Sequence, residues 1–431
     1  MKNIWRKFLA LIRDFLGRAM HSSHGSFIAG SAIAQFLPLI SAPIVARLYT
    51  PTDFGTYAVF YSLATILGSS ATLAFHNAVY LEKDDASAWD AVSLSAVTSF
   101  IFCLMVFGAI HVAPESILKS LFGEKLLLIL DWLPLTIFLS SVYLVLYAWF
   151  VRNNRYMTLG RNKLILATAT MLVQIGVGYL QLGAIGFVIA NLIGYFLAIM
   201  LLVFSGAGRP LGSLTKISTT DLLGIALRHK RLPAYTLPAG LVNSFGSQIP
   251  ELMINKLFGS YQLGQYSLAN RMVSLPLSFL STSLQDIFRE QASREFNESG
   301  HCENTFRKFF WLLLIISAVL LVPIVLIVPM VFPVIFGNQW GEAGYLVRAL
   351  VFLMAVRFIS SPISYIWIIR GKQHMDLYWQ IGLLLVSFFA FLMSVKIFQN
   401  PSLMQSLLTY SVFSGLWYVF CIFISKRFSR I

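Results

Sequence analysis

The segment RLYTPTDFGTYAV at residues 47–59 is repeated in weaker form as KLFGSYQLGQYSL at residues 256–268. The two strings align without a gap, with a basic residue, Leu, an aromatic residue, Gly and Tyr in the same register. A second echo follows in the same order, because WFVRNNRY from Trp149 aligns with WIIRGKQH from Trp367. Two ordered echoes indicate a duplicated half. Related halves in a hydrophobic chain are typical of transporters that bind their substrate between the halves.

The composition places the chain in a membrane. Hydrophobic residues make up 57% of its 431 residues and charged residues only 12%, whereas soluble domains carry about 25% charged residues. A chain this poor in charge cannot cover its surface in water, so we expect an integral membrane protein. The 3 cysteines imply no disulfide framework.

The apolar segments are long enough for twelve transmembrane helices, since a helical span needs about 20 residues. We place the spans at about 26–46, 54–76, 88–112, 126–150, 161–182, 184–206, 233–256, 263–285, 308–335, 343–369, 376–396 and 402–424. Six spans return the chain to the same side of the membrane. The sequence therefore predicts an all-α polytopic protein with two six-helix bundles related by a parallel repeat.

The predicted domains follow from these spans. Residues 1–25 lack the continuous apolar core of a signal peptide and are predicted to form an amphipathic helix on the cytoplasmic surface. The N-terminal bundle occupies 26–206 and the C-terminal bundle 233–425, joined by a basic cytoplasmic linker at 207–232. Residues 426–431 form a cytoplasmic tail.

The distribution of Lys and Arg sets the orientation. With the N-terminus in the cytoplasm, 24 of the 32 basic residues fall in inward segments, 5 in outward segments and 3 within spans. We therefore expect both termini to be cytoplasmic. The net charge of +14 then belongs to loops that face the cytoplasm and indicates no nucleic-acid partner.

The string SAIAQFLPLISAPIVARLYTPTDFGTYAVFYSLATIL at 31–67, followed by NAVYLEKDDASAWD at 77–90, resembles the opening of bacterial polysaccharide flippases of the Wzx type. These proteins belong to the multidrug/oligosaccharidyl-lipid/polysaccharide exporter superfamily, and RLYTPTDFG is the most specific part of the match. Beyond roughly the first 90 residues the resemblance is one of topology.

The resemblance implies a flippase rather than an enzyme. It implies alternating access that moves undecaprenyl-pyrophosphate-linked oligosaccharide units from the inner to the outer leaflet of the bacterial inner (plasma) membrane, for surface polysaccharides such as the O-antigen of lipopolysaccharide. The lipid bilayer and other polysaccharide-assembly membrane proteins are the further partners expected.

Arginines inside the spans are candidate substrate ligands, since a charge at mid-bilayer costs about 2.5–3.5 kcal/mol on insertion scales. A guanidinium suits phosphate because it can donate two parallel hydrogen bonds. We therefore expect Arg271 and Arg357 to face a central cavity and attract the pyrophosphate, although Arg271 could instead form a structural ion pair. Arg348 lies nine residues before Arg357, so an ideal helix places the two on opposite faces. Arg348 could pair with an acid near the outer rim.

Two further cations and two acids complete the candidate site. Arg47 and Lys256 occupy equivalent outward ends of the first and seventh spans, as cavity residues or as interfacial anchors that reach the headgroups. Glu251 and Asp131 could bind H⁺ or Na⁺ as coupling ions, because a poorly hydrated carboxylate takes up a proton more readily. Both acids lie toward outward ends, where they could also be solvated or paired.

No motif predicts catalysis. There is no Walker lysine motif, and no group of His, Cys, Asp and Glu has metal-ligand spacing. The sequence therefore predicts no catalytic residue, no metal site and no cofactor apart from a coupling ion. A few aromatic residues, such as Tyr57, Tyr266 or Trp149, could stack on sugars.

Two alternatives stay open at this stage. A drug/cation antiporter of the same superfamily should offer carboxylates to its substrate, whereas here the arginines within spans outnumber the deep acids. A membrane-embedded polysaccharide polymerase or ligase should carry a large outward loop, whereas every predicted outward connection is short.

Overall fold

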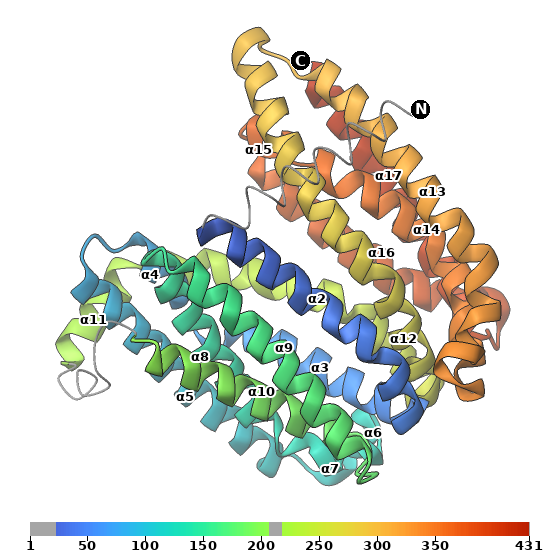
Figure 1. Ribbon diagram of the computed structural model, residues 1–431, viewed down its shortest axis with the longest axis horizontal. Coiled ribbons are helices and arrows are strands. Elements are labelled where there is room, and N and C mark those ends of the chain that lie inside the picture. The colour runs from blue at the N-terminus through green and yellow to red at the C-terminus, as the bar shows by residue number, and fades with distance from the viewer. Residues whose placement is uncertain (1–22, 207–217, 431) are drawn as a thin grey trace. The chain divides into compact units, whose positions relative to one another are not determined.

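The chain is helical throughout the part that the structure describes. The computed structural model describes residues 23–206 and 218–430, and these residues contain helices and turns but no β-strand (Figure 1). The all-α fold predicted from the sequence is confirmed. The predicted surface helix at 1–25 lies outside the described residues except for its last three, which begin α2. Residues 207–217 of the predicted linker also lie outside them.

By their contacts the described residues form two compact units. Unit 1 contains the residues up to Leu48 and Leu63–Leu241, and unit 2 contains Tyr49–Ser62 and the residues from Val242 onward. The assignment of Tyr49–Ser62 to unit 2 differs from the division expected from the repeat, which kept this segment in the first half. The six-helix bundles at 26–206 and 233–425 stay a prediction.

The helices that begin in unit 1 are α2 (Ser23–Leu48), η1 (Phe75–Asn77), α4 (Ala78–Leu81), α5 (Asp85–Val112), α6 (Glu115–Phe122), α7 (Glu124–Leu130), α8 (Leu133–Arg152), α9 (Tyr156–Gly178), α10 (Ile185–Phe204), α11 (Thr219–Arg228), the π-helix η3 (Leu232–Thr236) and α12 (Leu237–Ser299). Those that begin in unit 2 are α3 (Pro51–Ala71), α13 (Glu303–Phe336), η4 (Asn338–Trp340), α14 (Gly341–Ile363), α15 (Ile366–Ile369), α16 (Gln373–Phe398) and α17 (Leu403–Arg430).

Many of these helices can cross a membrane. Among the described residues, 8 helices are long and apolar enough to do so, and the bent pair Pro51–Ala71 and Phe75–Leu81 would make 9. The other predicted spans, at 161–182, 233–256 and 263–285, lie on α9 and α12. Each of these three segments carries Gln, Asn and a charged residue, which lowers its mean hydropathy.

Several helices do not begin and end where the predicted spans do. The seventh and eighth spans are joined by Gly259 alone, whose φ of 80° and ψ of 174° break the helical path of α12. Such a φ favours glycine, because a side chain there would clash with the backbone. The second half of α12 continues to Ser299 rather than ending at 285, and the fourth span is interrupted between α7 and α8 at Asp131 and Trp132.

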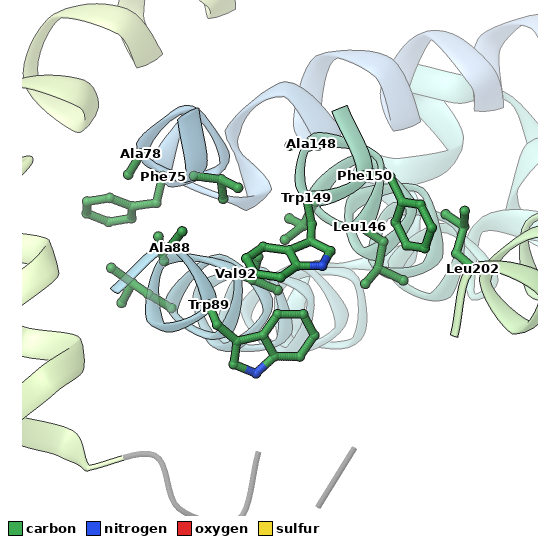
Figure 2. Close-up of a cluster of buried hydrophobic side chains, with 14 of the residues drawn as sticks. Phe75, Ala78, Ala88, Trp89, Val92, Leu146, Ala148, Trp149, Phe150 and Leu202 are labelled. Carbon is green, nitrogen blue, oxygen red and sulfur yellow. The ribbon is translucent and has the colours of Figure 1, made fainter. Parts of the chain in front are cut away.

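Unit 1 has a core built from apolar residues of α4, α5, α8 and α10. In Figure 2, Trp89 of α5 meets Trp149 of α8 edge to face, with ring centroids 5.0 Å apart and an interplanar angle of 74°. Phe150 and Leu202 extend the same cluster toward α10. Because Trp149 is only 5% exposed, it packs the core and is not available to stack on a sugar.

The first sequence echo marks a reciprocal contact between two helices of unit 2. A Cβ at Gly55 of α3 would lie 1.7 Å from the carbonyl oxygen of Ser260, and one at Gly264 of α12 would lie 1.7 Å from that of Pro51. The repeat aligns Pro51 with Ser260 and Gly55 with Gly264. Each helix therefore presents its glycine to the equivalent carbonyl of the other, and the glycines are needed for this close crossing.

The second echo places two arginines with similar roles in separate units. Arg152 donates hydrogen bonds to the carbonyls of Val79 and Glu82 at the end of α4, and Arg370 donates to the carbonyl of Phe428 in α17 at 3.0 Å. Carbonyls at helix C-termini lack partners within their own helix. In both halves the repeated arginine thus satisfies the end of a neighbouring helix.

Candidate functional site

Arg357 stands out in unit 2 as an accessible cation on a packed helix. The stretch Asn338–Ile369, which contains α14, is the most buried of the candidate spans. On it the neighbours Val356 and Phe358 are 7% and 3% exposed, whereas Arg357 itself is exposed. A guanidinium that remains accessible on such a helix can be reached by a ligand.

Three tyrosines interact electrostatically with this guanidinium. Arg357 interacts electrostatically with Tyr266 of α12 and with Tyr410 and Tyr418 of α17. Tyr266 and Tyr418 are buried, at 3% and 8% exposed, and Tyr410 is half-buried. Tyrosine offers an aromatic face together with a hydroxyl that donates and accepts hydrogen bonds. Three helices thus bring one cation and three such groups together.

Glu251 is the acid of this group. It lies in the first half of α12 and interacts electrostatically with Arg357. Its Oε2 atom is buried and has no hydrogen-bond partner. A buried carboxylate oxygen without a donor is unfavourable when it is charged. The position therefore suits a carboxylate that binds an ion or a proton.

Arg271 has different neighbours. It is half-buried on the second half of α12 and interacts electrostatically with Tyr57 and Tyr61 of α3. These two rings lie 6.1 Å apart. Arg271 and Arg357 each lie beside tyrosines of unit 2, but they share none of them.

Arg348 has a backbone partner in the neighbouring helix α13. Its Nε donates to the carbonyl of Val325 in α13 at 3.2 Å, and its guanidinium lies 5.5 Å from the Tyr345 ring centroid. Pro329 lies four residues after Val325 and lacks an N–H, so this carbonyl has no donor within its own helix. Arg348 supplies that donor, which favours a role in packing.

The remaining sequence candidates are Arg47, Lys256 and Asp131. Arg47, at the end of α2 in unit 1, and Lys256, in α12, are both exposed. Asp131 is exposed at the α7–α8 break, with its Oδ1 3.9 Å from Nε2 of His111. Their assignment to substrate or ion binding stays a prediction. Within residues 23–206 and 218–430, no three His, Cys, Asp or Glu side chains form a metal-binding group.

Sequence reasoning missed Tyr410 and Tyr418. They are eight residues apart on α17, which is about two helical turns, so a search for polar aromatics on one face of the last span would have found them. Their proximity to Arg357 depends on the packing of α14 against α17 and leaves no trace in either segment alone.

Comparison with solved structures defines the class. The fold matches that of the lipid II flippase MurJ in an inward closed conformation, with a TM-score of 0.74 and 13% identity, over 93% of this chain and 87% of the other. It also matches a multidrug resistance MATE family transporter in an inward-facing conformation, with a TM-score of 0.67 and 12% identity, over 92% and 95% of the two chains. The protein therefore shares the two-lobe fold of these two transporters.

The chain belongs to a family of polysaccharide biosynthesis proteins, whose profile matches residues 44–344 and thus parts of both halves. The resemblance to polysaccharide flippases found in the sequence is confirmed. A curated relative, the teichuronic acid biosynthesis protein TuaB of Bacillus subtilis, is 24% identical over 153 residues, which are 36% of this chain and 32% of the relative. The alignments span about a third of the length of the curated relatives that the chain matches.

Proposed function

We propose that the protein flips undecaprenyl-pyrophosphate-linked oligosaccharides from the inner to the outer leaflet by alternating access, and that the Arg357 group binds the pyrophosphate. The observation that carries this proposal is that Arg357, an exposed residue on a packed helix, interacts electrostatically with Tyr266, Tyr410 and Tyr418. A guanidinium binds phosphate oxygens in a bidentate manner, and Tyr410, the half-buried tyrosine of the group, can supply a further donor. The polyprenyl tail would stay in the bilayer.

Glu251 supplies the coupling step in this proposal. Before substrate arrives, the Glu251 carboxylate interacts electrostatically with Arg357. Arrival of the pyrophosphate brings negative charge to the same guanidinium, so the carboxylate is repelled and takes up a proton or Na⁺. This competition would link substrate binding to the ion gradient across a bacterial inner membrane, with both termini of the chain in the cytoplasm.

A drug/cation antiporter is the second candidate, because Glu251 and the tyrosines would also suit an organic cation. Arg357 argues against it, since a fixed guanidinium repels cations. A polymerase or ligase gains no support, as the folds that match are those of transporters. Other polysaccharide-assembly membrane proteins remain the expected partners.

Reconstituted vesicles provide the test. A labelled undecaprenyl-pyrophosphate oligosaccharide is added to the inner leaflet, and its appearance in the outer leaflet is followed by lectin binding. Arg357→Lys keeps the positive charge but lacks the planar guanidinium that can donate two parallel hydrogen bonds, so we expect it to slow flipping roughly tenfold. We expect Arg357→Ala to abolish flipping. Arg307→Lys is the matched control, because Arg307 is exposed at the start of α13.

Normal flipping by Arg357→Ala would remove this residue from the site. If wild-type vesicles expose no oligosaccharide but exchange an organic cation for protons, the antiporter is the correct assignment.

A further inference from the structure

A lysine in unit 1 lies among aromatic rings, far along the chain from the Arg357 group. Lys163 of α9 places its Nζ 4.6 Å from the ring centroid of Phe27 in α2 and 5.2 Å from that of Tyr147 in α8. Both distances are typical of cation–π contacts. The ammonium is therefore held between two rings that come from different helices.

The rings continue beyond these two. Tyr156 meets Phe27 edge to face at 5.9 Å, and Tyr143 lies 6.2 Å from Tyr147 and 5.6 Å from Tyr195. Tyr80 of α4 also interacts electrostatically with Tyr147. We call this set the Lys163 cage; its members are Phe27, Tyr80, Tyr143, Tyr147, Tyr156, Lys163 and Tyr195.

The ammonium of Lys163 forms no ion pair with the residues that the structure describes. Among the described residues, 23–206 and 218–430, no carboxylate oxygen lies within 4.0 Å of its Nζ. An ammonium carries three N–H donors, and contacts with ring faces leave these donors without an oxygen acceptor. Lys163 is half-buried, so an external anion can complete its coordination.

The cage differs from the hydrophobic core beside it. Phe27, Tyr143 and Tyr147 pack with one side against the core cluster that contains Trp149, which fixes their positions. Yet these rings are half-buried rather than buried, and Tyr80 is 44% exposed. The cage therefore combines rings that pack against the core with ring atoms that remain partly exposed.

Its place in the predicted topology suits a ligand that arrives from the cytoplasmic leaflet. Phe27 begins the first span, Tyr147 ends the fourth, and Tyr156 lies in the inward connection before the fifth. Tyr143 and Tyr195 lie deeper in their spans. The cage would thus extend from the inner membrane surface toward the middle of the bilayer.

We propose that the Lys163 cage binds the phosphosugar headgroup of a lipid-linked oligosaccharide when it enters from the inner leaflet, an inference that rests on the proposed function. The ammonium of Lys163 pairs with a phosphate as a point charge. The tyrosine faces pack on the apolar C–H side of a sugar ring, and their hydroxyls exchange hydrogen bonds with its hydroxyl groups. The ligand class is a sugar linked to an anionic phosphate.

Binding measurements with two probes test the cage. The protein is placed in phosphatidylethanolamine nanodiscs and titrated with a short-chain prenyl pyrophosphate that carries N-acetylglucosamine, and with the same prenyl pyrophosphate without sugar. Lys163→Met should weaken both probes roughly tenfold, the loss expected for a charge-assisted contact. Tyr147→Leu and Tyr143→Leu should weaken only the sugar-bearing probe.

Matched variants separate binding from folding. Lys308→Met removes the same charge from an exposed position at the start of α13 and should leave both affinities unchanged. Lys163→Arg keeps the positive charge and Tyr147→Phe keeps the aromatic ring. Both variants should therefore bind the probes with nearly the affinity of the wild type.

Three outcomes would overturn the proposal. The cage is not the site if Lys163→Met binds both probes as the wild type does, or if Lys308→Met loses as much affinity. It is a site for ordinary anionic lipid if phosphatidylglycerol in the nanodisc displaces both probes. If the wild type flips the oligosaccharide and any of these outcomes is observed, only the cage proposal is contradicted. If the wild type neither binds the probes nor flips the oligosaccharide, the proposed function is contradicted as well.

Discussion

The crossing of α3 and α12 predicts that a single methyl group destabilises unit 2. Gly55→Ala would place a carbon 1.7 Å from the carbonyl oxygen of Ser260, whereas ordinary van der Waals contact begins at 3.4 Å. The helices would have to separate by about the difference, 1.7 Å, because the atom that clashes belongs to the backbone and cannot rotate away. Overpacking of this kind costs about 1–3 kcal/mol.

Neighbouring hydrogen bonds raise the expected cost toward the upper end of that range. Gln265, next to Gly264, is fully buried. Its Nε2 donates to the carbonyl of Gln339 at 2.6 Å, and its Oε1 accepts from the backbone N–H of Ala343 at 2.9 Å. A shift of α12 that relieves the clash would stretch these bonds and leave buried polar groups unpaired, which is costly.

The two glycines should also be coupled. Once Gly55→Ala has separated the helices, Gly264→Ala meets a wider gap, so the double variant should lose less stability than the sum of the single variants. A difference of about 1 kcal/mol is typical for residues that share one contact. Gly68→Ala is the control. Gly68 lies on the same helix as Gly55, and a Cβ added there would meet no neighbouring atom within 4 Å.

Equilibrium unfolding in mixed micelles measures these free energies. Gly68→Ala should be neutral or slightly stabilising, because alanine favours a helix by up to about 1 kcal/mol over glycine. The reasoning fails if Gly55→Ala is as stable as Gly68→Ala, or if the effects of Gly55→Ala and Gly264→Ala add without any coupling.

Three shorter predictions concern other parts of the molecule. Trp149→Ala should lower the free energy of unfolding by about 3–5 kcal/mol, as for other buried aromatic residues; a loss below 1 kcal/mol in the same unfolding assay would contradict its place in the core. Glu251→Gln should uncouple flipping from the proton or Na⁺ gradient in vesicles, whereas unchanged ion dependence would exclude that role. Burial alone would raise the pKa of Glu295, but hydrogen bonds from Thr305 and Asn304 at the start of α13 hold it below the ordinary value of 4.5. Glu295 therefore stabilises the fold above pH 4.5, and this contribution disappears as the pH falls through the lowered pKa. Glu295→Gln should thus cost stability at pH 7 and progressively less as the pH falls through the lowered pKa, while a cost independent of pH would contradict the carboxylate's role.

Helix boundaries show where prediction from sequence reached its limit. Apolar length located every predicted span on a helix, but it missed the single-residue break at Gly259 and the extension of α12 to Ser299. The hydropathy of a segment reflects the free energy of transferring its side chains into lipid. It therefore does not indicate whether a helix continues beyond the apolar segment. The break at Asp131 was missed for the related reason that one turn of irregular backbone barely alters the mean hydropathy.

For the candidate site, the spacing of residues within one helix indicated which face each residue occupies. The sequence did not indicate which residues of different helices lie close together. The nine-residue separation of Arg348 and Arg357 indicates opposite faces of an ideal helix, because helical geometry is local. The partners of each arginine, Val325 for the first and Glu251 with the tyrosines for the second, come from other helices. No local pattern could have named them.

The sequence by itself determined the class of this protein: an all-α membrane transporter with a duplicated half, since composition and repeats are properties of the chain. Only the tertiary structure showed why the echoes exist. Gly55 and Gly264 each meet the other helix's equivalent carbonyl, and Lys163 lies among rings from several helices. Such contacts depend on how helices pack in three dimensions, where a shift of 1–2 Å changes which side chains touch.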